Sequence, residues 1–229
     1  MPQARIFLSV VTSLVLAGCS SGSLLSDVSR AFIKDQFGSG DDPVVGSTLN
    51  PSYRYLKVSV KGLAPALLVL GYVDHDPQGD IEVWYSADHE VVKTQNGRIV
   101  GTSGLPMDWR SVRFTAAPPA WDSLTQASST LTRVRDEMPG YRYDIADQLT
   151  LSRVTGVPST VLPASLPLDI AKRYQWVRES QSGARPGLPD SWYALEKVGG
   201  KYQVAYSYQC LSKQLCLNLQ RWPIQKADL

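Results

Sequence analysis

The sequence predicts a mainly β domain, an antiparallel barrel-like or strongly curved sheet with one N-terminal helix and few short helices. Three observations favour this class. Apolar and polar residues alternate along several short segments, which is the period of a half-buried strand. Turn signals such as Asn96-Gly97 and Gly199-Gly200 separate these segments. A helical stripe is expected only near the N-terminus, and many strands with little helix indicate a barrel or sandwich.

Residues 1–18 predict a lipoprotein signal peptide. They hold a single charge, Arg5, then an apolar run from Ile6 to Val15 that is too short to span a membrane. Leu16-Ala17-Gly18-Cys19 matches the bacterial lipobox. We therefore expect cleavage before Cys19, whose thiol and new amino terminus carry several acyl chains that anchor the mature protein.

Residues 19–43 predict a lipidated N-terminus, a tether helix over 24–37 and a linker that ends at Pro43. Ser20, rather than an aspartate, follows the lipidated cysteine, which predicts sorting to the outer membrane. Residues 44–229 then form a β-rich domain that faces the periplasm.

The first strands of this domain are expected where the two-residue alternation is clearest, over 56–60 and 81–86. The continuous apolar run 66–73 predicts a central strand in which Gly71 marks a bend. Asn96-Gly97 supplies the positive φ values of a two-residue type I′ turn and predicts a hairpin of 90–94 with 98–102.

The C-terminal third predicts a three-strand meander over 192–197, 201–210 and 215–222. Between the two groups of strands, 121–127 predicts a short helix. The segment 157–167 holds three prolines and predicts an irregular crossing loop.

Composition limits the classes of function. The net charge of +2 is too small to indicate a nucleic-acid partner, and no later apolar run is long enough for a membrane span. About 210 residues of mature chain suit one globular domain. Cys210 and Cys216 predict a disulfide in an oxidising compartment, which stabilises by about 2 kcal/mol through the small loop it closes. A zinc site is the weaker alternative, because no second Cys or His pair lies near them.

The two histidines, His75 and His89, lie beside acidic residues that ligate metals in proteins. The acidic neighbours are Asp74, Asp76 and Asp80 near His75, and Asp88 and Glu90 near His89. A strand over 80–86 separates the histidines by roughly 20 Å, at about 3.3 Å per residue. We therefore expect solvated hairpin loops at both positions, with no metal and no cofactor.

No catalytic residue is assigned. The segment Gly101-Thr102-Ser103-Gly104 lacks the second glycine position of a nucleophile elbow, and we expect a loop there. Paired carboxylates for glycoside cleavage stay open, since 21 acidic residues allow many pairs whose separation in space the sequence does not reveal.

Two groups of side chains are candidates for contact with a ligand. Tyr202, Tyr206 and Tyr208 are expected on one face of a strand, where they could line a groove that binds polysaccharide, although most aromatic rings belong to the core. The second group is basic: Arg133, Arg135 and Arg142, beside Tyr141 and Tyr143, could meet an anionic polymer. A solvated basic edge is the simpler expectation for it.

Seven blocks of the mature chain form a recognisable series: Tyr53–Leu56, Leu70–Val73, Val83–Tyr85, Asn96–Leu105, Arg133–Tyr143, Tyr206–Gln209 and Leu215–Leu219. These blocks resemble the YjbF/GfcB family of lipoproteins. Their order, together with the lipobox, carries the resemblance over most of the mature chain. The pair Cys210 and Cys216 departs from the family pattern.

The resemblance implies a mainly β, barrel-like fold and a role in producing group 4 capsule or exopolysaccharide. It implies a non-enzymatic accessory lipoprotein of the outer membrane, with other polysaccharide-secretion proteins and the polysaccharide itself as expected partners. It supplies no catalytic residues. Two other functions stay open: a carrier or receptor that holds a lipid or acylated ligand inside an open barrel, and a polysaccharide-modifying enzyme.

Overall fold

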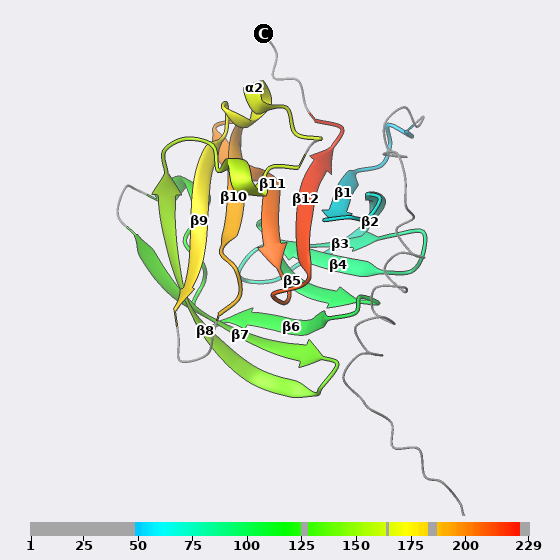
Figure 1. Cartoon of the computed structure of the whole chain (residues 1–229), viewed down its shortest axis with the longest axis vertical. Helices are drawn as coiled ribbons and strands as arrows, with labels where there is room; N and C mark the ends of the chain where they lie inside the picture. Colours follow the sequence, from blue (N-terminus) through cyan, green and yellow to red (C-terminus); the bar gives the residue numbers. More distant parts are fainter. Residues whose placement is uncertain (1–48, 125–127, 164, 183–186, 225–229) are drawn as a thin grey trace, which may run out of the picture.

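The computed structural model describes residues 49–124, 128–163, 165–182 and 187–224, which form a nearly closed antiparallel barrel (Figure 1). The signal peptide, Cys19, the tether helix over 24–37 and the linker that ends at Pro43 lie outside the described residues, so they stay predictions. No helix of the described ranges has the length and hydropathy to cross a membrane.

Twelve strands make up a single sheet. They are β1 (Tyr55–Val60), β2 (Ala66–Asp74), β3 (Ile81–Tyr85), β4 (Val91–Gln95), β5 (Arg98–Ser103), β6 (Asp108–Phe114), β7 (Ser129–Met138), β8 (Arg142–Val154), β9 (Gln175–Ser182), β10 (Ser191–Val198), β11 (Lys201–Cys210) and β12 (Cys216–Trp222). Two 3-10 turns, η1 (Trp121–Ser123) and η2 (Ser159–Val161), and one short helix, α2 (Leu168–Ala171), complete the described elements.

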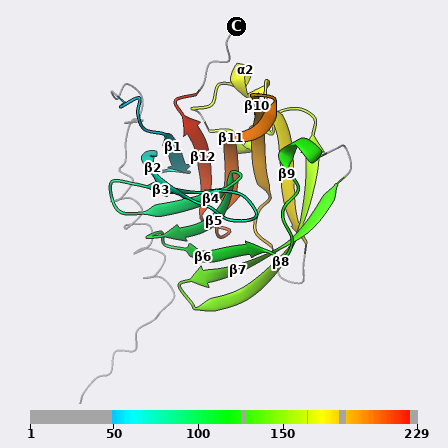
Figure 2. The same cartoon turned by 180° about the vertical axis from the view of Figure 1, so that it is seen from behind.

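The strand order is β5-β4-β3-β2-β1-β12-β11-β10-β9-β8-β7-β6, with every pair antiparallel. In both views β9–β12 run upright while β4–β7 lie across them (Figures 1 and 2). The edge strands β5 and β6 follow one another in the chain and meet through side chains. The Thr102 hydroxyl donates to Asp108 Oδ1 at 2.9 Å and accepts from the Trp109 backbone N–H at 3.0 Å. These bonds link the two edge strands, which share no strand ladder.

The alternation, the apolar run 66–73 and the turn signals together predict β1 to β5 and β10 to β12 correctly, to within a residue or two at each end. Asn96 and Gly97 take the positive φ values, 50° and 78°, that the type I′ turn requires. The register of β2 with β3 shifts between Leu70 and Tyr72, so Gly71 marks the expected irregularity.

Four strands, β6 to β9, were not predicted from the sequence. The expected helix over 121–127 is wrong in extent, because the described part is a single 3-10 turn that ends at Ser123. The crossing segment 157–167 contains η2 and leads into α2.

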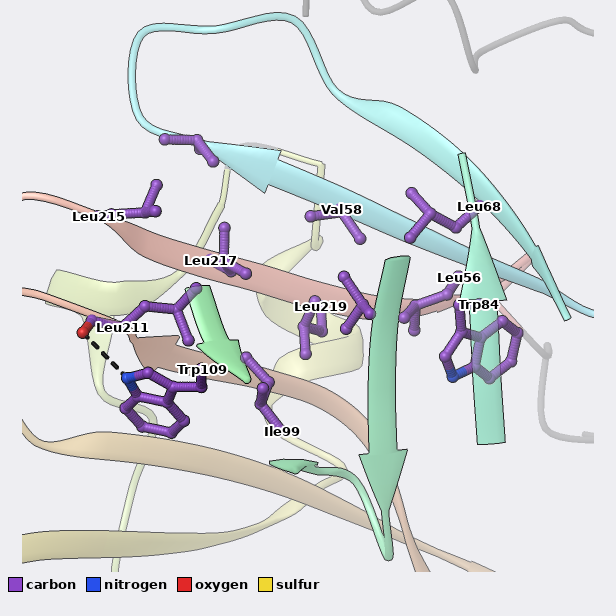
Figure 3. Packing of buried hydrophobic residues seen from close by; sticks show 12 residues of the cluster. Leu56, Val58, Leu68, Trp84, Ile99, Trp109, Leu211, Leu215, Leu217 and Leu219 are labelled. Carbon is purple, nitrogen blue, oxygen red and sulfur yellow. Dashed lines mark hydrogen bonds between the residues drawn. The ribbon is translucent and has the colours of Figure 1, made fainter. Parts of the chain in front are cut away.

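An apolar core fills the half of the barrel formed around β1, β2 and β12 (Figure 3). It consists of Leu56, Val58, Val60, Leu68, Trp84, Val92, Ile99, Trp109, Leu211, Leu215, Leu217 and Leu219. The Trp109 indole N–H donates to the Leu211 carbonyl oxygen at 3.2 Å, which ties β6 to the β11–β12 turn (Figure 3). Two small pockets of about 20 and 10 Å³ lie beside this core and are lined in part by its side chains.

Two further clusters lie on opposite faces of β9 to β11. Val177, Leu195 and Val204 belong to the inner cluster, whereas Trp176 and Tyr206 belong to an outer cluster beneath α2. The Trp176 indole N–H donates to the Ala171 carbonyl oxygen at 3.0 Å and holds α2 on this face.

Candidate functional site: a charged cleft at one end of the barrel

Charged side chains occupy inward positions on β7, β8 and β9. On β7 every second residue from Leu131 to Glu137 is buried. The inward positions of this strand therefore change from an apolar residue to charged ones. We define the charged cluster as Arg98, Arg133, Arg135, Glu137, Asp147 and Glu179, all of which are buried. Buried charges persist in proteins only when they are paired.

The expectation of a solvated basic edge is therefore wrong for Arg133 and Arg135, each only 6% exposed. Both lie on inward positions of β7. Arg142 fits the expectation better, since its side chain is 51% exposed at the start of β8.

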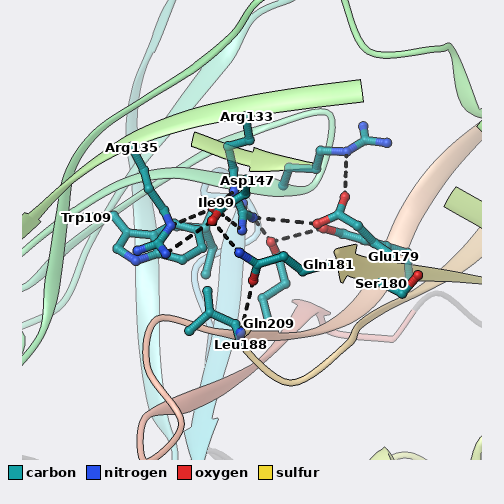
Figure 4. Close-up of polar contacts among 12 residues, drawn as sticks. Ile99, Trp109, Arg133, Arg135, Asp147, Glu179, Ser180, Gln181, Leu188 and Gln209 are labelled. Carbon is teal, nitrogen blue, oxygen red and sulfur yellow. Dashed lines mark hydrogen bonds and ion pairs between the residues drawn. The ribbon is translucent and has the colours of Figure 1, made fainter. Parts of the chain in front are cut away.

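Asp147 is the hub of the charged cluster (Figure 4). Its Oδ2 accepts from Arg133 Nε at 3.0 Å, from Arg133 Nη2 at 2.9 Å and from Arg135 Nε at 2.6 Å. Its Oδ1 accepts from Arg135 Nη2 at 3.3 Å and from the Gln181 side-chain amide. Both oxygens are thus fully engaged, which suits an anchor for two guanidinium groups rather than a free acid or base.

The other two carboxylates of the charged cluster also lie between arginines. Glu137 pairs with Arg135 and with Arg142. Glu179 lies 3.5 Å from Arg98 Nε and 3.6 Å from Arg133 Nη1.

Aromatic faces support the buried guanidinium groups. Arg133 lies 4.5 Å from the ring centre of Trp109, and Arg98 lies 3.9 Å from that of Trp121. Burial lowers the pKa of the Arg135 guanidinium, and Asp147 opposes that shift. Each buried guanidinium of the charged cluster thus lies near at least one carboxylate and one aromatic ring.

The charged cluster opens into a cleft of about 710 Å³ at one end of the barrel. Three segments far apart in the sequence form its walls: the β7–β8 hairpin, the residues that flank the β9–β10 connection, and the β11–β12 turn. In Figure 1 this end lies opposite α2. Its lining includes Tyr143, Gln181, apolar residues such as Leu188 and Leu211, and six charged residues: Arg135, Glu137, Arg142, Asp144, Asp147 and Lys213.

A disulfide holds one wall of the cleft. Cys210 and Cys216 face each other across the β11–β12 pair with their Cα atoms 3.9 Å apart and form the bond that the sequence predicts. Leu211, Ser212 and Lys213, which line the cleft, lie in the loop that the disulfide closes. The bond fixes the wall that carries Lys213.

The three tyrosines expected on one face of β11 do not share it. The register of β10 with β11 shifts between Ala194 and Leu195, which are paired with Tyr206 and Val204, so Ala205 is an extra residue. Tyr202 therefore packs on the inner cluster, whereas Tyr206 and Tyr208 belong to the outer one.

A ligand platform over all three tyrosines is excluded by this arrangement. Tyr206 is 1% exposed, and its hydroxyl donates to the Val161 carbonyl oxygen and contacts Asn218. Contact of Tyr202 or Tyr208 with a polysaccharide stays a prediction.

His75 and His89 lie beyond opposite ends of β3, and His75 contacts Asp80 at 2.8 Å on the exposed surface. Within the described ranges no group of three or more His, Cys, Asp or Glu side chains is arranged to hold a metal. The segment from Gly101 to Gly104 is not the expected loop, since it forms the end of β5 and one following residue.

The sequence of residues 49–162 matches the model of the group 4 capsule polysaccharide lipoprotein family, GfcB and YjbF. This chain belongs to that family. The match covers β1 to β8 and thus includes Arg133, Arg135 and Asp147, but the cleft wall around the disulfide lies outside it. The resemblance of the blocks after residue 162 is not part of the match. No curated protein matches the chain by sequence.

Among solved structures, the chain is similar to the crystal structure of the hypothetical lipoprotein YmcC from Escherichia coli K12. The similarity covers 92% of this chain and 100% of that one, with a TM-score of 0.58 and 21% identity. The YjbF-family chain therefore shares its fold with a second lipoprotein along nearly its whole length.

Proposed function

We propose that the protein is an outer-membrane lipoprotein that faces the periplasm and serves as a non-enzymatic accessory factor in the assembly or export of capsule or exopolysaccharide. The observation that carries the proposal is membership of the capsule polysaccharide lipoprotein family. The Leu16-Ala17-Gly18-Cys19 lipobox supports the anchor, and Ser20 supports the outer membrane as its destination.

The cleft supports an accessory role rather than catalysis. Its most buried carboxylate, Asp147, has both oxygens engaged by guanidinium and amide donors, and Glu137 lies between two arginines. A general acid or base has to exchange a proton with substrate, and such engagement works against that. The cleft is suited to hold a polar partner without changing it.

A lipid carrier receives less support. A carrier of this kind encloses an apolar cavity of several hundred Å³. The two pockets beside the apolar core measure about 20 and 10 Å³, which is too small for an acyl chain. The 710 Å³ cleft has six charged side chains in its lining beside apolar ones such as Leu188 and Leu211.

The proposal is tested by deleting the gene and measuring surface and secreted polysaccharide under inducing conditions. Deletion should reduce the polymer, and the wild-type gene should restore it. A Cys19→Ser variant should fail to restore it, as should the same domain released into the periplasm by an ordinary cleavable signal. Unchanged polymer in the deletion strain would contradict the function, and full rescue by the released domain would contradict the need for the anchor.

A further inference from the structure

We propose that the cleft binds an anionic segment of a polysaccharide, with an acidic sugar held by Arg142 and Lys213 and a sugar ring stacked on Tyr143. This assignment rests on the proposed function for its choice of a polysaccharide. It adds the chemical class of the ligand and the residues that contact it.

The ion pairing of the cleft favours an anion. Its lining holds three cations, Arg135, Arg142 and Lys213, and three carboxylates, Glu137, Asp144 and Asp147. Each carboxylate has an arginine partner, and the partners of Asp144 and Asp147 include Arg113 and Arg133, which do not line the cleft. The negative charges of the lining are therefore neutralised, whereas Lys213 keeps a positive charge that is unpaired within the described ranges and attracts an acidic polymer.

Lys213 and Arg142 are the cations available to a ligand. Lys213 is exposed and has no ion-pair partner among the residues that the structure describes. Arg142 is 51% exposed, and its partner Glu137 is also held by Arg135. A carboxylate or other anionic group on a sugar can thus reach both side chains without breaking the buried pairs around Asp147.

Tyr143 supplies an apolar surface beside these cations. It lines the cleft, and 58% of its surface is exposed. The face of an aromatic ring complements the C–H face of a sugar ring, while neighbouring charged groups fix the orientation.

The backbone holds Arg142 and Tyr143 in place. The residues on either side, Tyr141 and Asp144, take positive φ values of 52° and 54°, which side-chain-bearing residues seldom adopt. The Asp144 backbone N–H donates to Asp136 Oδ1 at 2.9 Å and its carboxylate pairs with Arg113. Such backbone positions are often found at binding sites, where surrounding contacts maintain them.

The cleft is of the size that ligand sites in proteins usually have, on the order of 300 to 1,000 Å³. One wall is fixed by the disulfide and the other by the Asp144 contacts. A preformed site of this kind loses little entropy when it binds an extended polymer.

The test measures binding to the mature lipidated protein, purified in neutral detergent, by titration calorimetry. The probes are short oligogalacturonates, their methyl esters and the polysaccharide purified from the producing cells. The esters keep the backbone of the sugar chain and remove its charge. The acidic oligomer should bind at least about tenfold more tightly than the ester, and added salt should weaken its binding.

Lys213→Ala and Arg142→Ala should each weaken binding of the acidic oligomer by about five- to tenfold, and the double variant by more. Tyr143→Ala should weaken binding of the acidic oligomer as well. Lys201→Ala and Arg173→Ala remove exposed cations at the opposite end of the barrel and serve as matched controls, with unchanged affinity expected. Unfolding midpoints equal to that of the wild type establish that every variant folds.

Three results would overturn the proposal: equal affinity for acid and ester, wild-type affinity in the cleft variants, or no binding of either acidic oligomer or native polysaccharide. These outcomes differ from failure of the proposed function. Loss of polymer in the deletion strain without binding would leave the function standing and remove the site. Binding of the acidic oligomer together with unchanged polymer in the deletion strain would keep the site and contradict the function.

Discussion

The apolar core and the charged cluster occupy two regions of the same barrel and obey the same two-residue alternation, but they differ in what the inward positions hold. Around β1 and β12 those positions are Leu and Val, whereas on β7 they become Arg133, Arg135 and Glu137. Apolar burial is non-directional and stabilises strongly. Buried ion pairs are directional, and their net contribution to stability is small because desolvation opposes it. The comparison indicates that the apolar core holds the fold and the charged cluster shapes the cleft.

The largest expected effect is in the charged cluster. Asp147→Ala leaves Arg133 and Arg135 buried without their shared carboxylate, so the free energy of unfolding should fall by about 3 to 5 kcal/mol. Urea unfolding measures it. Asp88→Ala, on an exposed loop, is the control and should change stability by less than about 0.5 kcal/mol. If the Asp147→Ala protein were as stable as the wild type, Asp147 would not be needed to keep Arg133 and Arg135 buried.

A slightly smaller effect is expected in the apolar core, where shape alone matters. Leu217 is fully buried on β12, and Leu217→Ala should lower the free energy of unfolding by about 3 kcal/mol. Leu217→Met keeps the volume and should cost less than about 1.5 kcal/mol. If the methionine variant were as unstable as the alanine variant, the core would depend on more than volume, and the contrast with the charged cluster would weaken.

The disulfide lies where the two regions meet at the cleft. Replacing both Cys210 and Cys216 with serine should lower the free energy of unfolding by about 2 kcal/mol, because the small loop is no longer closed in the unfolded chain. The wild type in reducing agent should unfold at the denaturant concentration of the double variant. A wild type indifferent to reductant would mean that the bond does not stabilise the fold.

The smallest effect is expected at Tyr174, which lies outside both the apolar core and the charged cluster. Burial raises the pKa of Tyr174 from 10.0 to about 12. Above pH 10.0 the unfolded chain releases this proton while the folded chain keeps it, so stability should fall as pH rises toward about 12. Tyr174→Phe should leave stability at neutral pH nearly unchanged and make the alkaline decline shallower. If the loss of stability with rising pH were the same in the Tyr174→Phe variant, that loss would come from other groups.

The sequence predicted eight strands but not β6 to β9, and the inward charges of β7 explain why that strand was missed. On β7 the inward residues after Leu131 are Arg133 and Arg135, while the apolar Val134 points outward. A half-buried strand normally has its apolar residues on the inward face, so the alternation of hydropathy does not identify this strand. The hub Asp147 gave no local signal, because its partners lie on β7 and β9. Only the pairing of strands brings them together.

The tyrosines of β11 illustrate a second limit. A strict period of two places Tyr202 and Tyr206 on one face, but the extra residue Ala205 reverses the faces between them. No local pattern marks this bulge. The disulfide, by contrast, was predictable because its two cysteines are six residues apart within one hairpin.

The most direct test of the central claim compares charge reversal at the two ends of the barrel. One variant carries Arg142→Glu with Lys213→Glu at the cleft, and the other carries Arg173→Glu with Lys201→Glu at the opposite end, so both change the net charge equally. Surface polysaccharide is measured in a deletion strain complemented by each, at matched protein levels. The cleft variant should yield no more polymer than the deletion strain, whereas the opposite-end variant should restore the wild-type amount. Equal restoration by both would contradict the assignment of function to the charged cleft.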